Sequence, residues 1–493
     1  MVGNERGASE HRRRLDRLFA GGLAWSAGAK SVTQLLSWAS VLIAARLLSP
    51  SDFGLTAMAG AFAGMTNVLA EFGIGSAVLQ MQELEREVLA QIHTFACFLC
   101  VGIFLAGEAA SPLIAGFFKS ERLLPVLLVN NVVFFITGFQ QVPMALLQRD
   151  MDYRRLSLSE AAVACVQSIA TIAAAFAGWR YWSLVAGVVA GRVTGAALGY
   201  YWQPIPFRMP RWKQIGSPVR MGAQIAIARL AWSAYTQSDG VVVGRRLGES
   251  LLGTYQMAMM LASAPAEKIC MLIMRAAGPL FAKIQKDREL VRRYFLIITE
   301  AIGLLVLPLM LGLAVVAPDA IAALLGRKWV GAAAPLMWLA LFVAVRSMAV
   351  LSDQVLVPLR QTRFTMGMAL LNLAVMPAAF WFASRWGLDA VSASWLILSP
   401  ITVLPVIVKL MRSAQITFRE IILSLTPALT GACAMLAAVA LVRQWPGGNA
   451  YTRLLTQAGA GAAAYALVLM VPFRDRVLRY FRFLYSLRQA SGA

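Results

Sequence analysis

Long apolar runs, separated by short charged or Pro/Gly-containing stretches, follow one another along the whole chain. A hydrocarbon core about 30 Å thick needs about 20 predominantly apolar residues per helix, and these runs reach that length. The pattern therefore predicts an all-α polytopic membrane protein with about fourteen transmembrane helices. The predicted spans are 19–45, 53–79, 88–114, 123–147, 157–178, 182–202, 216–243, 251–281, 294–316, 331–357, 364–384, 388–408, 420–442 and 452–473.

The composition agrees with this class. The 493 residues are 59% hydrophobic and only 14% charged, whereas about 25% would be charged in a soluble protein. A formal net charge of +21 would suggest a nucleic-acid partner in a soluble protein, but here Lys and Arg gather mainly in alternate loops. The positive-inside rule explains that bias. We therefore expect no nucleic-acid partner, cytoplasmic N- and C-termini, and contact between the basic C-terminal tail and membrane lipids.

A short sequence pattern occurs twice. Arg46-Leu47, followed by Phe53-Gly54, recurs about 200 residues later as Arg246-Leu247, followed by Leu252-Gly253. Parallel repeats of this kind are common in secondary transporters, with the substrate site between the repeats. The predicted divisions are an N-terminal six-helix lobe at 1–202, a C-terminal six-helix lobe at 203–415, two extra spans at 416–473 and the basic tail at 474–493.

Ionisable residues inside the spans are candidates for a functional site, because a charge at mid-bilayer is costly unless it faces a cavity or a partner. Upstream of each repeated pattern lies one basic residue, Lys30 or Arg229, on a helix face that also carries polar side chains. These faces predict a cationic cleft. The candidate substrate-binding residues are Lys30, Gln34, Arg229, Lys268, Arg275 and Arg346, and the candidate ion-coupling residues are Glu71, Asp239 and Asp353.

Structural roles are the alternative for several of these residues. Arg346 and Asp353 are seven positions apart and can pair within one helix, and Glu267 is adjacent to Lys268. Tryptophans near span ends are typical interface anchors. The tryptophans in such positions are Trp38, Trp179, Trp182, Trp202, Trp212, Trp329 and Trp386.

Enzyme motifs are missing from the sequence. It contains only two histidines, so a histidine metal site is not expected. It has no P-loop, no G-x-G-x-x-G after a strand and no G-x-S-x-G. We therefore expect a protein that is not an enzyme and has no metal or other cofactor. Transport would use a proton or sodium gradient, or the gradient of the substrate itself.

Four segments carry a family resemblance. In their order and spacing they resemble the Wzx-type oligosaccharide (polysaccharide) flippases of the multidrug/oligosaccharidyl-lipid/polysaccharide exporter superfamily. The segments are ARLLSPSDFGL at Ala45–Leu55, ALLQRDMDYRRLS at Ala145–Ser157, DGVVVGRRLGESLLGTYQMA at Asp239–Ala258 and LLGRKWVGAAAPLMWLA at Leu324–Ala340.

The resemblance implies a flippase of the bacterial inner membrane. Its substrates would be undecaprenyl-diphosphate-linked oligosaccharide repeat units for O-antigen, capsule or exopolysaccharide, moved by alternating access. A cationic cleft suits such a substrate, because Lys and Arg bind phosphate strongly. One alternative is an exporter of the same fold for another lipid precursor or a drug, although a drug cation would favour an acidic cavity. A membrane polysaccharide polymerase is the other, and such enzymes commonly carry a larger periplasmic loop than any predicted here.

Overall fold

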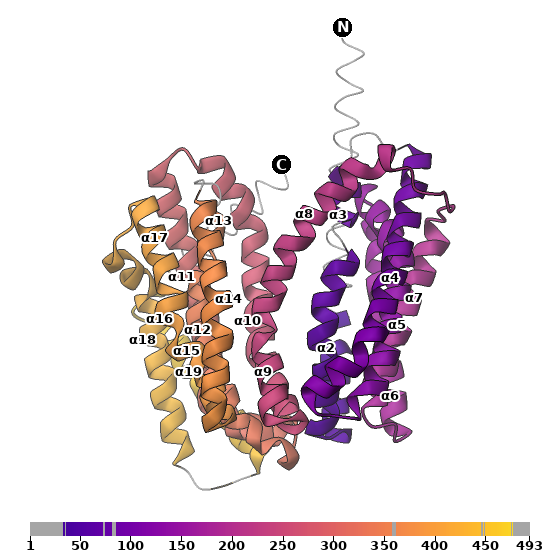
Figure 1. Ribbon diagram of the computed structural model, residues 1–493. Helices are drawn as coiled ribbons and strands as arrows, with labels where there is room; N and C mark the ends of the chain where they lie inside the picture. Colours follow the sequence, from indigo (N-terminus) through magenta and orange to yellow (C-terminus); the bar gives the residue numbers. More distant parts are fainter. Residues whose placement is uncertain are drawn as a thin grey trace. The chain divides into compact units, whose positions relative to one another are not determined.

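The protein is described by a computed structural model, shown in Figure 1. Its described part is helical and contains no strand, which confirms the all-α class. The contacts divide the chain into two compact units, Met1–Gly253 and Thr254–Ala493, and each is described by itself below. The described residues are 33–34, 36–71, 74–80, 85–356, 361–444, 447, 449–474 and 476.

The first unit is a bundle in which α5 contacts most of the other helices. Figure 1 draws its helices in indigo to magenta. The long helix α10 begins in this unit and continues in the second. The helices are Leu36–Leu47, α2 (Pro50–Glu71), α3 (Ile74–Gln80), α4 (Arg86–Phe118), α5 (Leu123–Arg149), α6 (Tyr153–Phe176), α7 (Trp182–Trp202), α8 (Trp212–Thr236), α9 (Ser238–Leu247) and α10 (Glu249–Ile284).

The second unit is arranged around α11, which contacts α12, α18 and α19. Figure 1 draws it in magenta to yellow. Its elements after α10 are α11 (Arg288–Leu324), η1 (Arg327–Ala332), α12 (Ala333–Ala349), α13 (Ser352–Leu356), α14 (Thr362–Ala383), η2 (Ser384–Trp386), α15 (Leu388–Ile397), α16 (Ser399–Thr402), α17 (Leu404–Ala414), α18 (Phe418–Arg443) and α19 (Ala450–Met470).

Among the described residues, eleven segments are long and apolar enough to cross a membrane. The chain is therefore a multi-pass membrane protein, whereas the count of fourteen spans and the orientation of the termini stay predictions. The first predicted span lies partly outside the described residues. Helices α8 and α19 occupy the predicted spans 216–243 and 452–473 without being among the eleven segments.

Breaks between helices interrupt several predicted spans, including 331–357, which contains α12 and α13. Helix α8 ends at Thr236, and α9 begins at Ser238, inside the predicted span 216–243. The span 388–408 contains α15, α16 and α17, with a proline in the first turn of each of the last two helices. Proline lacks the backbone N–H that a helix interior needs, so it favours a new helix start over a continuous helix.

Glycines allow α7 to pack closely on its neighbours. A Cβ on Gly187 would lie 1.9 Å from Oγ1 of Thr171 on α6, and one on Gly195 would lie 2.4 Å from Nε2 of Gln140 on α5. Small residues at four-residue spacing let membrane helices approach one another in this way. The buried glycines of this stripe are Gly187, Gly191, Gly195 and Gly199.

Aromatic side chains form part of the core of the second unit. The indole Nε1 of Trp395 donates a hydrogen bond of 2.8 Å to the hydroxyl of Tyr255. The rings of Phe342 and Phe380 each lie 4.9 Å from that of Trp395. Trp329 is also completely buried, so its interpretation as an interface anchor was wrong. A buried indole contributes packing area that an interfacial one would leave in lipid or water.

Polar contacts fix α19, the second of the two extra predicted spans, to α11. Asp319 of α11 accepts a hydrogen bond of 3.0 Å from Gln457 of α19 and lies 3.1 Å from the guanidinium of Arg453. The hydroxyl of Tyr465 donates a hydrogen bond of 2.7 Å to the carbonyl of Leu304. Polar contacts between helices of this kind stabilise membrane bundles, so α19 is an integral part of the second unit.

Candidate functional site

An ion pair joins α8 to α2 within the first unit. Nη1 of Arg229 lies 3.4 Å from Oε2 of Glu71, and the amide of Asn67 donates a hydrogen bond of 2.9 Å to the other carboxylate oxygen. Just beyond the end of α8, a Cβ on Gly64 of α2 would lie 2.5 Å from the amide nitrogen of Gln237. The close approach at Gly64 holds the helices together, and the ion pair lies on the surface between them.

Both members of this pair stay accessible. The exposed fractions of the Arg229 and Glu71 side chains are 53% and 44%. A guanidinium has five N–H donors, and Glu71 accepts at one long contact, so donors remain for a ligand. The sequence suggested Arg229 for substrate binding and Glu71 for ion coupling, and the structure brings these two candidates into contact. The pairing itself was not predicted.

The other candidates of the first unit have different environments. Lys30 lies outside the described residues. Gln34 is helical and half-buried. Asp239 is buried in the first turn of α9, where its Oδ1 accepts a hydrogen bond of 2.6 Å from the backbone N–H of Gly240. A carboxylate in the first turn stabilises a helix, so Asp239 has a local structural role whether or not it also binds an ion.

The remaining candidates belong to the second unit. Lys268 is exposed on α10, and Arg346 is exposed near the end of α12. Arg275 lies in α10 and Asp353 in α13, and the side chains of both fall outside the described part of the structure. The ion pair considered for Arg346 and Asp353 therefore stays a prediction, as does the role of all four residues in substrate or ion binding.

A cavity of about 580 Å³ lies inside the first unit, lined by the helix Leu36–Leu47 together with α2, α5, α6 and α7. Its wall is mostly apolar but includes the carboxylate of Glu160 and the amide of Gln167, both from α6. Glu160 was not among the candidates. It lies in the predicted span 157–178, seven positions before Gln167, so the spacing criterion used for other spans would have identified it.

The two copies of the repeated sequence pattern contact each other inside the first unit. A Cβ on Gly54 would lie 1.7 Å from the carbonyl oxygen of Glu249, and one on Gly253 would lie 1.8 Å from the carbonyl oxygen of Pro50. Glu249 and Gly253 follow Pro50 and Gly54 by the same interval along the chain, so the contact is reciprocal. The hydroxyl of Ser51 also donates a hydrogen bond of 2.5 Å to the Glu249 carboxylate.

Solved structures identify the fold. The lipid II flippase MurJ in an inward closed conformation superposes with a TM-score of 0.76 at 14% sequence identity, covering 92% of this chain and all of that one. An inward-facing multidrug resistance MATE family transporter of the MOP superfamily gives a TM-score of 0.61 at 13% identity, over 78% of this chain and 96% of the other. At such low identity these likenesses establish a MurJ- and MATE-like fold alone.

Sequence relatives identify the family. The lipopolysaccharide biosynthesis protein WzxC of Escherichia coli (strain K12) is 24% identical over 319 residues, which are 62% of this chain and 63% of WzxC. The succinoglycan biosynthesis transport protein ExoT of Rhizobium meliloti (strain 1021) is 26% identical over 62% of each chain. The match thus spans less than two thirds of either relative. Residues 43–334 match the model of a family described as polysaccharide biosynthesis protein. The chain therefore belongs to this family, and one of the relatives, ExoT, is named as a transport protein.

Proposed function

We propose that this protein moves undecaprenyl-diphosphate-linked oligosaccharide repeat units from the cytoplasmic to the periplasmic leaflet of the bacterial inner membrane. The repeat units would serve O-antigen, capsule or exopolysaccharide synthesis. Family membership and the names of the relatives support the class of cargo, and the fold shared with a lipid II flippase supports the class of movement.

The observation that carries this proposal is the accessible pair of Arg229 and Glu71, which joins two helices of the membrane domain. Guanidinium groups bind phosphate oxygens through two parallel hydrogen bonds, which makes arginine well suited to a diphosphate. An arginine with unused donors on a half-exposed surface can bind the head group while the polyprenyl chain stays in lipid. Lys30, Gln34, Lys268, Arg275 and Arg346 are the further residues proposed to contact the head group or its sugars.

The same pair offers a way to couple transport to an ion. If a phosphate takes over the guanidinium of Arg229, the Glu71 carboxylate loses its cationic partner. That carboxylate would then be free to bind a proton or a sodium ion in place of the guanidinium. Binding of the substrate and of the ion would then favour each other, because coupling between two sites is reciprocal. Asp239 and Asp353 remain alternative carboxylates for this step.

A complementation experiment tests the proposed function. A strain that lacks the gene should lose surface polysaccharide and accumulate lipid-linked repeat units, and the wild-type gene should restore both. Arg229→Gln should fail to restore them at normal expression, whereas Arg155→Gln should succeed, because Arg155 forms an ion pair of the same 3.4 Å length with Asp152 at the start of α6, away from the Arg229–Glu71 pair. Normal surface polysaccharide in the deletion strain would contradict the proposal, and altered drug resistance alone would favour a drug exporter of the same fold.

A further inference from the structure

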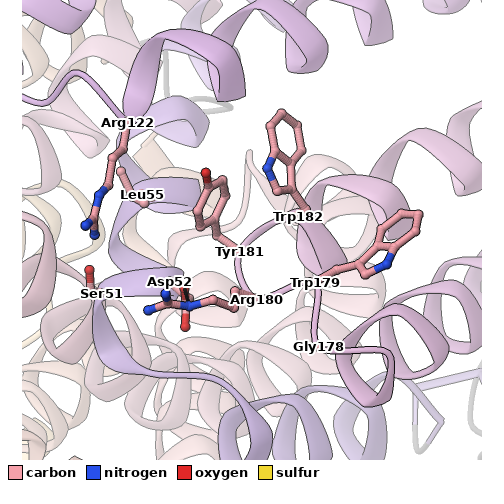
Figure 2. Close-up of a pocket in the computed structure, with 9 residues that line it drawn as sticks. All are labelled: Ser51, Asp52, Leu55, Arg122, Gly178, Trp179, Arg180, Tyr181 and Trp182. Atoms are coloured by element: carbon pink, nitrogen blue, oxygen red, sulfur yellow. Dashed lines mark ion pairs between the residues drawn. The ribbon is translucent and has the colours of Figure 1, made fainter.

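A second cavity of the first unit lies among its interhelical turns (Figure 2). Its volume is about 570 Å³. It is lined by Ser51, Asp52 and Leu55 of α2, by Arg122 before α5, and by residues 178–182 in the turn between α6 and α7. The cavity lining carries two guanidinium groups and one carboxylate, so it has a cationic excess.

The guanidinium groups of Arg122 and Arg180 lie at the cavity, and their N–H donors are not used in hydrogen bonds to other described residues. The exposed fractions of the Arg122 and Arg180 side chains are 66% and 69%. Nη1 of Arg122 is 3.9 Å from Glu249, and Nε of Arg180 is 3.8 Å from Asp52. These distances allow electrostatic attraction but exceed a hydrogen bond. Within the described residues, neither guanidinium donates a hydrogen bond, so both can donate to a ligand.

The nearby carboxylates are already satisfied by other donors. Oδ2 of Asp52 accepts hydrogen bonds of 2.9 Å and 2.6 Å from the backbone N–H and the hydroxyl of Ser49. Glu249 accepts the hydroxyl of Ser51 at 2.5 Å. Since these hydrogen bonds fix the carboxylates, a ligand can bind the arginines without leaving a buried acid unsatisfied.

Hydrogen bonds within the turn that carries Arg180 fix its backbone conformation without a ligand. Gly178 and Arg180 adopt left-handed backbone conformations, with φ angles of 80° and 50°. The carbonyl of Arg180 accepts hydrogen bonds from the backbone N–H of Ser183 at 3.0 Å and from its hydroxyl at 2.5 Å. A left-handed conformation is unfavourable for a non-glycine residue such as Arg180. The hydrogen-bonded turn maintains it, and a preorganised site lowers the cost of binding.

The position of the cavity along the candidate membrane spans indicates what kind of molecule can reach it. The cavity lies where four candidate membrane spans, α2, α5, α6 and α7, begin or end. Trp179 is 57% exposed there, and Figure 2 shows the rings of Trp179 and Trp182 pointing away from Asp52. Exposed tryptophans at span ends are typical of the head-group layer of a bilayer. Lipid head groups are therefore the molecules that surround the cavity at the highest concentration.

We propose that this cavity binds the phosphate head group of a membrane lipid, with Arg122 and Arg180 as its two ligands. The alternation of basic loops along the sequence predicts that these turns are periplasmic. Two sources share this chemistry: an anionic phospholipid and the diphosphate of a polyprenyl-linked substrate. Only the second source rests on the proposed transport function, so the two must be measured separately.

The test uses the full-length protein in a neutral detergent, titrated with short-chain phosphatidylglycerol, farnesyl diphosphate or inorganic pyrophosphate. Binding of at least one lipid probe should weaken about tenfold or more in the double variant Arg122→Gln/Arg180→Gln, because the variant removes both charged hydrogen-bond donors of the cavity. Weakening for phosphatidylglycerol identifies a phospholipid site, and weakening for farnesyl diphosphate identifies a polyprenyl site.

Two controls keep this test decisive. Arg385→Gln is the matched control, because Arg385 also neighbours a highly exposed tryptophan, Trp386, at a turn predicted to be periplasmic. Arg385 does not line the cavity, so this variant should bind the lipid probes as the wild type does. The variant Arg122→Lys/Arg180→Lys keeps both charges but lacks the planar fork, so it should bind with intermediate affinity. Equal affinity of the wild type and the Gln double variant for every lipid probe would overturn the proposal. Binding of inorganic pyrophosphate without binding of either lipid probe would also overturn it.

Discussion

The backbone of Gly54 lies directly against the carbonyl of Glu249, so that a Cβ on Gly54 would be 1.7 Å from the carbonyl oxygen. The reciprocal contact, of Gly253 with the carbonyl oxygen of Pro50, would be 1.8 Å. The two copies of one sequence pattern therefore meet in an isologous contact of the kind found in two-fold symmetric interfaces. The glycines are required there because no side chain fits between the two backbones.

Replacing Gly54 by alanine should destabilise the protein by roughly 1–3 kcal/mol, because an added methyl group in a closely packed contact forces the backbones apart. Thermal unfolding in detergent, followed by circular dichroism, measures this effect as a lower Tm. Gly60→Ala is the matched control, since Gly60 lies in the same helix and a Cβ there would meet nothing within 4 Å. An equal Tm for Gly54→Ala and Gly60→Ala would show that Gly54 does not pack against the Glu249 carbonyl in the native protein.

The double variant Arg229→Gln/Glu71→Gln separates a structural role of this ion pair from a binding role. Exposed ion pairs contribute about 0–1 kcal/mol, so the double variant should have nearly wild-type thermal stability. Transport of the lipid-linked substrate should nevertheless fall at least tenfold, because the cation that binds phosphate is gone. The Tm of the purified variant checks the expected stability, and complementation of a deletion strain by the same variant checks the expected loss of transport. Full transport by the double variant would show that Arg229 does not bind the substrate.

Tyr465→Phe should lower stability by about 1 kcal/mol, because it removes one hydroxyl whose hydrogen bond to the Leu304 carbonyl joins α19 to α11. Thermal unfolding again provides the measurement, with Tyr201→Phe as the control, since the Tyr201 side chain is highly exposed. If Tyr465→Phe unfolds at the wild-type temperature, α19 is held by packing rather than by this contact.

Helix α7 shows which features of the fold follow from sequence. Its predicted range, 182–202, is also the observed one, because a long apolar run between charged turns leaves few alternatives. Interruptions were harder to predict. The break at Gln237 between α8 and α9 has no proline or glycine at that position, and its local signal is only the Ser238-Asp239 pair, which is typical of a helix start.

The candidate site was less predictable than the fold. Helical spacing identified Arg229 and Glu71 as unusual charges, but the contact between them depends on the packing of α8 on α2, which no periodicity encodes. Trp329 was taken for an interface anchor because it lies near a span end, yet tertiary packing buries it completely. Arg180 was not among the candidates, since its place in a cavity depends on segments that are far apart in sequence.

The most direct test of the central claim is a leaflet assay in proteoliposomes that contain purified protein and a fluorescent undecaprenyl-diphosphate-linked oligosaccharide. A membrane-impermeant quencher, added outside, reports how much substrate has reached the outer leaflet. We expect wild-type protein to let the quencher reach nearly all of the substrate, whereas Arg229→Gln leaves about half protected, as in protein-free liposomes. Equal protection with and without the wild-type protein, over a range of pH and sodium gradients, would contradict the account.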